Sequence, residues 1–204
     1  MNLENLFNPK SVAIIGASPE DGKVGNVIAK NVLELGYRGE VYLVNPKYDE
    51  IFGRKCYKKL SEIENPVDLA VMAIPAKFIP AEILESSEKI KNYVIISAGF
   101  SEIGEEGKER EEQIKKIAKE KGLNILGPNC LGFVAPKIKL NATFASGMPA
   151  AGNVALLSQS GALIVAIMDI AKDRNINFSH IVSIGNKMTI SETEMLEHLD
   201  NDPE

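Results

Sequence analysis

Short apolar runs alternate with amphipathic stretches along most of the chain. The apolar runs lie at residues 11–15, 40–45, 68–74, 93–97 and 124–126. Each is followed within two residues by a glycine or a proline, as is typical of buried parallel strands. Between the runs, apolar residues recur at helical spacing, which predicts helices after residue 23, at 78–90 and at 105–121. Strands that alternate with helices predict right-handed βαβ units, with a parallel sheet covered by helices on both faces.

The pattern changes in the last third of the chain. Residues 137–152 are rich in small residues and lack a helical period, which predicts irregular strands leading to a domain boundary. A strand is then expected at 153–157, a helix at 162–171, a strand at 180–184 and a helix at 191–199. Ser191 is a plausible N-cap of that last helix, with Glu194 completing a capping box.

Two strand–helix pairs are too few for an independent sheet domain. We therefore expect one domain over residues 1–150 and only the first part of a second over 151–204. On this interpretation Glu204 is a cleavage point or an artificial end of the chain.

Composition and charge narrow the class of protein. The 204 residues carry a net charge of −5, which argues against nucleic acid as the main partner. No stretch is long and apolar enough to span a bilayer, and the first ten residues lack the pattern of a signal peptide. We therefore expect a cytoplasmic protein without a membrane partner. Cys56 and Cys130 have no CxxC spacing, so neither a metal site nor a disulfide framework is predicted.

The loop after the first apolar run is the first candidate for chemistry. It opens a helix, so its backbone N–H groups lie at the positive end of a helix dipole, and Gly16 and Gly25 allow close backbone approach. The pyrophosphate of a nucleotide fits this arrangement. An ordinary strand-to-helix turn with glycines for packing fits the same residues.

The next strand ends narrow the ligand class. Lys47 follows the second run, where NAD-dependent dehydrogenases carry an acidic residue that holds the ribose. A cation there favours an extra ribose phosphate, as in NADP or coenzyme A, although an ordinary surface lysine fits equally well. Pro75, Ser97 and Ala98 close the third and fourth runs. They predict an uncharged wall of small residues for an adenine or a pantetheine arm.

The fifth run ends in the sequence GPNCLG. Pro128 is expected to restrict Gly127 to extended conformations and so to present Asn129 and Cys130 at the sheet edge. A nucleophilic Cys130 would need a base or cation nearby, and no histidine is close in sequence. A small buried residue near a ligand's reactive end is the favoured interpretation.

Seven motifs together resemble a known family. IIGAS, VNPK, AIPA, IISAGF, GPNCLGF, LLSQSGAL and SIGNK cover nearly the whole chain. In this order the motifs resemble the nucleoside-diphosphate-forming acyl-CoA synthetases, which include succinyl-CoA synthetase, and most of all the α part of ADP-forming acetate–CoA ligases. The resemblance implies an α/β chain with a Rossmann-like CoA-binding domain, followed by the start of a flavodoxin-like domain.

The resemblance also implies roles for individual residues. Four residues would contact the CoA phosphates: Ser18, Lys23, Val24 and Gly25. Lys47 would lie near the ribose phosphate; Ile96, Ser97 and Ala98 would flank the nucleotide or pantetheine; Asn129 and Cys130 would lie near the thiol. The transferred phosphoryl group would meet the loop of Ser158, Gln159, Ser160 and Gly161. Two hydroxyls and the N-terminus of a helix suit a dianion independently of the resemblance.

The implied reaction interconverts acyl-CoA, ADP and phosphate with a small carboxylic acid, CoA and ATP, through an acyl phosphate and a phosphohistidine. An ATP-grasp β subunit or domain would hold Mg-ATP or Mg-ADP, in a hetero- or homo-oligomer. No residue of this chain is assigned a catalytic role, because the phosphohistidine belongs beyond Glu204. His180 and His198 do not match it and are expected to be structural or solvated.

Ile164 and Val165 stand where succinyl-type enzymes have a tyrosine, which argues against a succinate pocket. The chain is expected to bind CoA but not to complete turnover alone. Two alternatives stay open at this point. One is a CoA-binding regulatory module of an acetyltransferase-type protein, and the other is an NADP-binding oxidoreductase domain.

Overall fold

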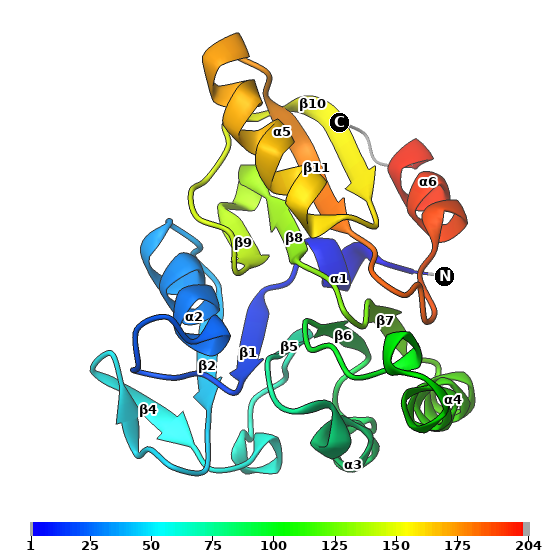
Figure 1. Ribbon diagram of the computed structural model, residues 1–204. Coiled ribbons are helices and arrows are strands. Elements are labelled where there is room, and N and C mark those ends of the chain that lie inside the picture. The colour runs from blue at the N-terminus through cyan, green and yellow to red at the C-terminus, as the bar shows by residue number, and fades with distance from the viewer. Residues whose placement is uncertain (1, 202–204) are drawn as a thin grey trace.

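The computed structural model describes residues 2–201 as two β-sheets flanked by helices (Figure 1). The expectation made from the sequence for Glu204 lies outside the described residues. The helices are α1 (Glu4–Phe7), α2 (Val24–Glu34), α3 (Ile79–Ser86), α4 (Glu105–Lys121), α5 (Gly161–Arg174) and α6 (Glu192–Asp200). Short 3-10 turns occupy η1 (Leu60–Glu62), η2 (Ala76–Phe78), η3 (Ser101–Ile103) and η4 (Pro136–Ile138).

The first sheet has seven strands in the order β3-β4-β2-β1-β5-β6-β7. Its bounds are β1 (Ser11–Ile15), β2 (Glu40–Val44), β3 (Glu50–Ile51), β4 (Arg54–Tyr57), β5 (Leu69–Met72), β6 (Asn92–Ile95) and β7 (Asn124–Leu126). The five apolar runs of the sequence are confirmed as β1, β2, β5, β6 and β7, all parallel to their neighbours. The hairpin of β3 and β4 at the sheet edge was not predicted, because its strands are short and mostly polar.

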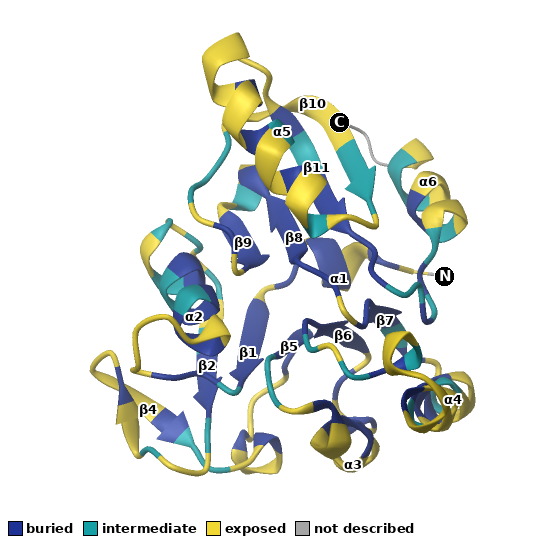
Figure 2. Cartoon of the chain, viewed as in Figure 1, coloured by how far each residue is buried: buried dark blue, intermediate teal, exposed yellow. Residues whose placement is uncertain are grey.

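Helices cover both faces of this sheet, as the alternating pattern predicts. Side chains of β1 point alternately to the two faces, so Val12 and Ile14 join one core while Ala13 and Ile15 join the other. The first core includes residues of α1 and α2, and the second includes residues of α3 and α4. Figure 2 shows the central strands β1, β5 and β6 buried, while the outer helix faces and much of the β3–β4 hairpin are exposed.

The second sheet has four strands in the order β10-β11-β8-β9. Its bounds are β8 (Gly132–Ala135), β9 (Leu140–Thr143), β10 (Ala151–Ser158) and β11 (Phe178–Ser183). We expected irregular strands over 137–152: a strand is present, but β9 is a regular antiparallel partner of β8 rather than an irregular strand. The partner strand supplies the hydrogen bonds, which local periodicity does not reveal. A boundary at residue 150 stays a prediction, and β8 and β9 precede it.

Helices α5 and α6 complete the described part of the second sheet. α5 connects β10 to β11, which are parallel, and contacts both strands. The capping box expected on α6 is confirmed: the Ser191 hydroxyl accepts a hydrogen bond from the backbone N–H of Thr193, and the Glu194 carboxylate accepts one from that of Ser191. Across residues 2–201 the structure contains no helix with the length and apolarity needed to cross a membrane.

Candidate functional site

A cavity of about 750 Å³ lies at the carboxyl ends of the strands of the first sheet. Residues that follow β5, β6 and β7 line one side of it, and the first turns of α5 line the other. No residue that lines it carries a charge. The cavity brings together these predicted site residues: Val24, Pro75, Ile96, Ser97, Ala98, Asn129, Cys130 and Gly161. The strand ends therefore form one uncharged wall, while the ligand of that wall stays a prediction.

The turn between β1 and α2 leads into the edge of this cavity. Gly16 has a φ of +92°, and a Cβ on it would lie 2.5 Å from the carbonyl oxygen of Ala73. A Cβ on Gly25 would lie 1.9 Å from the carbonyl oxygen of Gly16. Within residues 2–201 the backbone N–H groups of Val24 and Gly25 make no hydrogen bond. These two donors lie at the start of an 11-residue helix, where a bound anion is favoured.

Four of the five predicted phosphate-binding residues lie outside the cavity lining: Gly25, described above, and Ser18, Lys23 and Lys47. Ser18 is buried, and its hydroxyl accepts a hydrogen bond from the backbone N–H of Glu20 at 3.1 Å. Lys23 is the N-cap residue of α2 and is exposed. Lys47 is also exposed, on the turn after β2, and makes no ion pair within the described part of the chain. Both ammonium groups are thus accessible, whereas the Ser18 hydroxyl is turned to local structure.

The loop after β7 differs from the expectation in one respect. Gly127 was expected to be extended, and this is wrong: its φ is +93° and the Gly127–Pro128 peptide bond is cis. A Cβ on Gly127 would lie 2.6 Å from the carbonyl oxygen of Ile95, so close approach to β6 requires a glycine. Asn129 is exposed at the sheet edge, as predicted, but Cys130 is buried.

The environment of Cys130 disfavours a thiolate. Its side chain is buried, and its Sγ lies 3.3 Å from the carbonyl oxygen of Ile95, to which it donates. Burial raises the pKa of the Cys130 thiol to about 12. The residue is therefore a neutral, small wall residue rather than an activated nucleophile. Cys56, the other cysteine, is also free and buried.

The loop of Ser158, Gln159, Ser160 and Gly161 joins β10 to α5. Ser160 is the N-cap of α5, and its hydroxyl accepts from the backbone N–H of Leu163 at 3.2 Å. The Ser158 hydroxyl accepts from the backbone N–H of Ser160 at 3.0 Å. Both hydroxyls therefore serve the loop itself. Among the described residues no acceptor meets the N–H groups of Gly161 and Ala162, so both donors are available at the N-terminus of α5.

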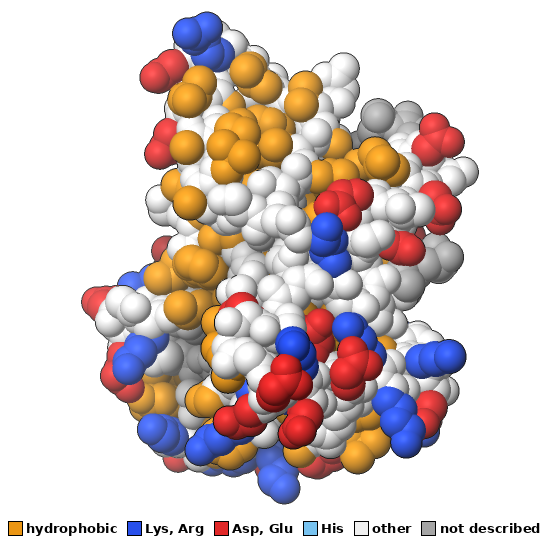
Figure 3. Space-filling view, turned by 45° about the vertical axis from the view of Figure 1, so that its right-hand side comes forward, with side chains coloured by type: hydrophobic (Ala, Val, Ile, Leu, Met, Phe, Trp, Pro, Cys, Tyr) orange, Lys and Arg blue, Asp and Glu red, His pale blue; other side chains and the backbone are white. Residues whose placement is uncertain are grey.

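Several cavity residues were missed by the sequence analysis. Phe144 follows β9, and Val165 lies on α5 one turn after Gly161; both line the cavity and are partly exposed. Figure 3 shows apolar side chains gathered on the part of the surface that includes α5, where Leu163 and Ile170 are also exposed. Helical spacing identifies Val165 as a neighbour of Gly161, but no signal in the sequence places Phe144 beside the strand ends.

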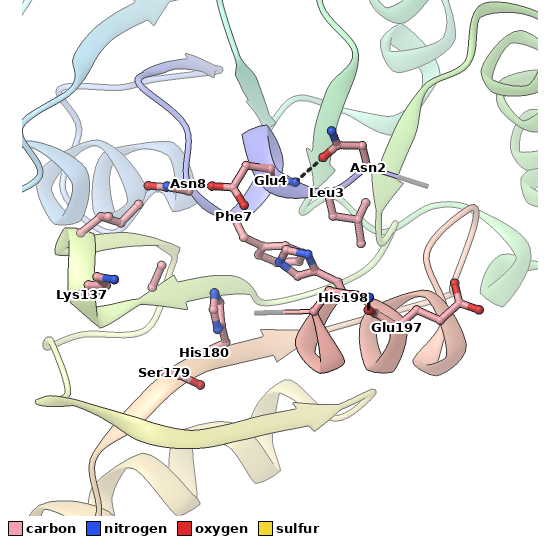
Figure 4. A pocket seen from close by; sticks show the side chains of 13 residues that line it. Asn2, Leu3, Glu4, Phe7, Asn8, Lys137, Ser179, His180, Glu197 and His198 are labelled. Atoms are coloured by element: carbon pink, nitrogen blue, oxygen red, sulfur yellow. Dashed lines mark hydrogen bonds between the residues drawn. The ribbon is translucent and has the colours of Figure 1, made fainter. Parts of the chain in front are cut away.

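A second cavity, of about 730 Å³, lies between α1, η4, β11 and α6. His180 and His198 both line it (Figure 4). Their rings contact the same phenylalanine: the Phe7 ring stacks on His198 at 5.3 Å between centroids and meets His180 edge-on at 5.7 Å. The structure thus brings the two histidines together in aromatic packing, away from the strand ends. Among residues 2–201 no three histidine, cysteine or acidic side chains are placed to hold a metal ion.

Comparisons with known proteins identify the families that the chain matches. Residues 10–136 match the family model described as CoA binding domain, and residues 151–204 match that of the succinyl-CoA ligase like flavodoxin domain. The chain is 50% identical to the ADP-forming acetate–CoA ligase of Methanocaldococcus jannaschii, over 98% of this chain and 28% of that protein. It is 48% identical to the α subunit of ADP-forming acetate–CoA ligase I of Pyrococcus furiosus, over 99% of this chain and 45% of that subunit.

A solved structure shares the whole described fold. The dinucleotide forming acetyl-coenzyme A synthetase 1 of Ca. Korarchaeum cryptofilum, in complex with phosphate and ADP, matches with a TM-score of 0.94 and 40% identity. The match covers 99% of this chain and 43% of that one. The chain therefore spans less than half of the length of these relatives.

Proposed function

Since the chain belongs to the CoA-binding domain family, we propose that it binds coenzyme A and supplies the CoA-binding part of an ADP-forming acid–CoA ligase. One observation carries the proposal. Two elements line the same cavity of about 750 Å³. One is the uncharged wall at the strand ends, and the other is the N-terminus of α5. A thioester arm on the wall would therefore lie within reach of an anion held by the helix.

The first sheet supplies groups for each part of coenzyme A. The unpartnered N–H groups of Val24 and Gly25 favour the pyrophosphate at the start of α2. The exposed ammonium groups of Lys23 and Lys47 add positive charge beside it, where a ribose phosphate would lie. The pantetheine arm would follow the small residues Pro75 and Ala98 toward Asn129. Gly16, Ser18, Ile96, Ser97 and Cys130 shape this path by packing.

The second sheet supplies the candidate phosphoryl site. The N–H groups of Gly161 and Ala162 and the dipole of α5 favour a dianion, while the hydroxyls of Ser158 and Ser160 hold the loop in shape. The side-chain amide of Gln159 ties the loop to the carbonyl oxygen of Gly185 at 3.4 Å. The chain would thus orient an acyl phosphate beside the CoA thiol.

The remaining steps need groups that this chain does not supply. A phosphohistidine and an ATP-grasp part that binds Mg-ATP or Mg-ADP would complete the ligase, as a hetero- or homo-oligomer in the cytoplasm. A small carboxylic acid would be the acyl donor. The support is the likeness to ligases and to an α subunit over less than half of their lengths. The chain alone is accordingly expected to bind CoA without forming ATP from acetyl-CoA, ADP and phosphate.

Titration calorimetry with CoA, 3′-dephospho-CoA and NADP tests the proposal. We expect CoA to bind more tightly than either of the other two. Replacing Lys47 by Ala should lower the affinity for CoA about fivefold, as expected for the loss of an exposed ion pair. The affinity for 3′-dephospho-CoA should not change. Lys116→Ala removes an exposed lysine of α4 and serves as the matched control. Tighter binding of NADP would refute the proposal and favour an oxidoreductase domain.

A further inference from the structure

A hydrogen-bond network outside the cavity lining joins its two sides. Gly99, just after β6, has a φ of +109°, and both of its backbone polar groups are held by side chains. The Glu102 carboxylate accepts from the N–H groups of Gly99 and Phe100, and the Arg110 guanidinium donates to the carbonyl oxygen of Gly99. The loop that carries Ser97 and Ala98 into the cavity therefore takes its shape from η3 and α4.

Asn186 reaches the same carboxylate from the second sheet. It lies in the turn after β11. Its Nδ2 lies 2.8 Å from Glu102 Oε2, 3.2 Å from Ser101 Oγ and 3.4 Å from Glu111 Oε2, and these three acceptors share its two hydrogens. Its backbone N–H donates to the carbonyl oxygen of Pro128 at 2.9 Å. Asn186 thus contacts the loops after β6 and β7 at once.

The turn that holds Asn186 also contacts the loop ahead of α5. The backbone N–H of Ile184 donates to the carbonyl oxygen of Ser158 at 3.0 Å, and the Gln159 amide donates to that of Gly185 at 3.4 Å. A Cβ on Gly185 would lie 2.2 Å from the carbonyl oxygen of Pro128, so the turn packs directly on the β7 loop. A continuous set of contacts therefore runs from the α5 N-terminus to the strand-end wall.

We propose that Asn186 is a positioning residue that holds the strand-end wall of the first sheet at a fixed distance from the N-terminus of α5. The proposal rests on the proposed function, because these two elements are the candidate CoA and phosphoryl sites. Asn186 does not itself line the cavity, although the Nδ2 of the lining residue Asn129 lies 3.5 Å from its Oδ1. It acts through Glu102, whose carboxylate fixes the wall loop.

A neutral amide suits position 186 because two carboxylates accept hydrogen bonds there. Glu102 and Glu111 both accept from Asn186, and Glu111 is buried and also pairs with Lys115 at 3.2 Å. Burial alone would raise the pKa of both carboxyl groups, but hydrogen bonds to the backbone, to Asn186 and, for Glu111, to Lys115 outweigh it and lower both pKa values. Both acids are therefore ionised acceptors for a neutral donor.

The variants Asn186→Ala and Asn186→Asp separate positioning from simple stability. Alanine removes the donor. Aspartate places a third carboxylate beside Glu102 and Glu111, with Arg110, Lys115 and Lys187 as the neighbouring cations, of which Lys187 pairs with Glu192. At about pH 7.5 it should repel them, whereas at about pH 5.5 a shared proton restores a hydrogen bond. Asn153→Asp, on the exposed strand β10, is the matched control.

Amide exchange by NMR on the ligand-free chain gives the first readout. We expect the amides of Gly99 and Phe100 to exchange about tenfold faster in Asn186→Ala, with the amides of β1 unchanged, because the Glu102 carboxylate that accepts from both amides loses the Asn186 donor. In Asn186→Asp the acceleration relative to wild type should be present at about pH 7.5 and largely lost at about pH 5.5. Unchanged exchange, or equal acceleration throughout the molecule, would overturn the proposal.

CoA affinity by calorimetry gives the second readout. Asn186→Ala should bind CoA about tenfold more weakly than wild type, and Asn186→Asp should regain affinity at the lower pH. Equal CoA affinity in wild type and both variants would overturn the positioning role. A wild-type chain that binds no CoA would instead refute the proposed function, and the exchange readout would still decide whether Asn186 holds the wall loop.

Discussion

Gly25 is the residue at which α2 comes closest to the end of β1. A Cβ there would lie 1.9 Å from the carbonyl oxygen of Gly16, which is backbone and cannot rotate away. This approach places the unpartnered N–H groups of Val24 and Gly25 at the start of α2, where Val24 lines the cavity. The residue thus has both a packing role and a role in the candidate phosphate site.

Replacing Gly25 by Ala should lower the free energy of unfolding by about 2–3 kcal/mol, because the methyl group forces α2 away from the turn. Urea denaturation measures this change. Gly122→Ala is the control: that residue has a φ of +64° but open space around its Cβ position. It should cost only about 1 kcal/mol of backbone strain. If both variants lost the same free energy of unfolding, the structure would have relaxed to relieve the contact between position 25 and the carbonyl oxygen of Gly16.

At the scale of elements, α2 packs on β9, and one buried side chain of α2 adds hydrogen bonds to the second sheet. The Nδ2 of Asn31 donates to the carbonyl oxygens of Thr143 and Ala145, each at 2.8 Å. Those two residues flank Phe144, which lines the cavity. Asn31 therefore fixes the segment that carries an aromatic ring into the candidate site.

We expect Asn31→Ala to lower the free energy of unfolding by about 2 kcal/mol, because the buried carbonyl of Thr143 loses its donor. Thermal or urea denaturation would detect this loss. Asn153→Ala, at an exposed position of β10, should change stability by less than about 0.5 kcal/mol. If Asn31→Ala also changed the free energy of unfolding by less than about 0.5 kcal/mol, water would have replaced the amide as the donor to the Thr143 carbonyl.

The local sequence pattern was sufficient to predict those elements whose periodicity or capping residues lie within the element itself. The helical period over 105–121 and the acidic start of that segment locate α4 at its observed bounds. The capping residues locate α6 in the same way. By contrast, β4 and β9 are strands because a neighbour pairs with them, and four-residue segments such as RKCY or LNAT carry no such information. Gly127 was misjudged because contact with Ile95, which is distant in sequence, decides its conformation.

The same distinction applies to the candidate site, where some residues can be predicted from local sequence and others depend on tertiary packing. Pro75, Ser97 and Asn129 are predictable as neighbours, because the carboxyl ends of parallel strands meet at one sheet edge. Phe144 and Asn186 are not predictable, because their places depend on how the second sheet packs on the first. Only the family resemblance connected Gly161 with the same site.

At the scale of the whole molecule, one core cluster extends through both sheets. It contains Val12 and Val71 of the first sheet and Phe133 and Val182 of the second. The Phe133 ring also meets that of Phe7 edge-on at 5.0 Å. The two sheets therefore share this apolar core cluster, and they are expected to unfold together.

Phe133→Ala should lower the free energy of unfolding by about 3–5 kcal/mol through loss of burial and a residual cavity. Urea unfolding should still show a single transition, with circular dichroism and tyrosine fluorescence coinciding. The exposed Phe78→Ala is the control and should cost far less. Two separated transitions in wild type or variant would contradict a shared core.

The position of β10 at the edge of the second sheet has a practical consequence. Residues 151–155 are exposed, and no described strand pairs with the outer side of β10. An open edge of this kind offers a row of unsatisfied peptide groups to any extended segment that meets it, including the same edge of another molecule. Concentrated stocks of this chain should therefore self-associate and scatter light, so dilute samples and frequent checks of particle size belong in every measurement made on it.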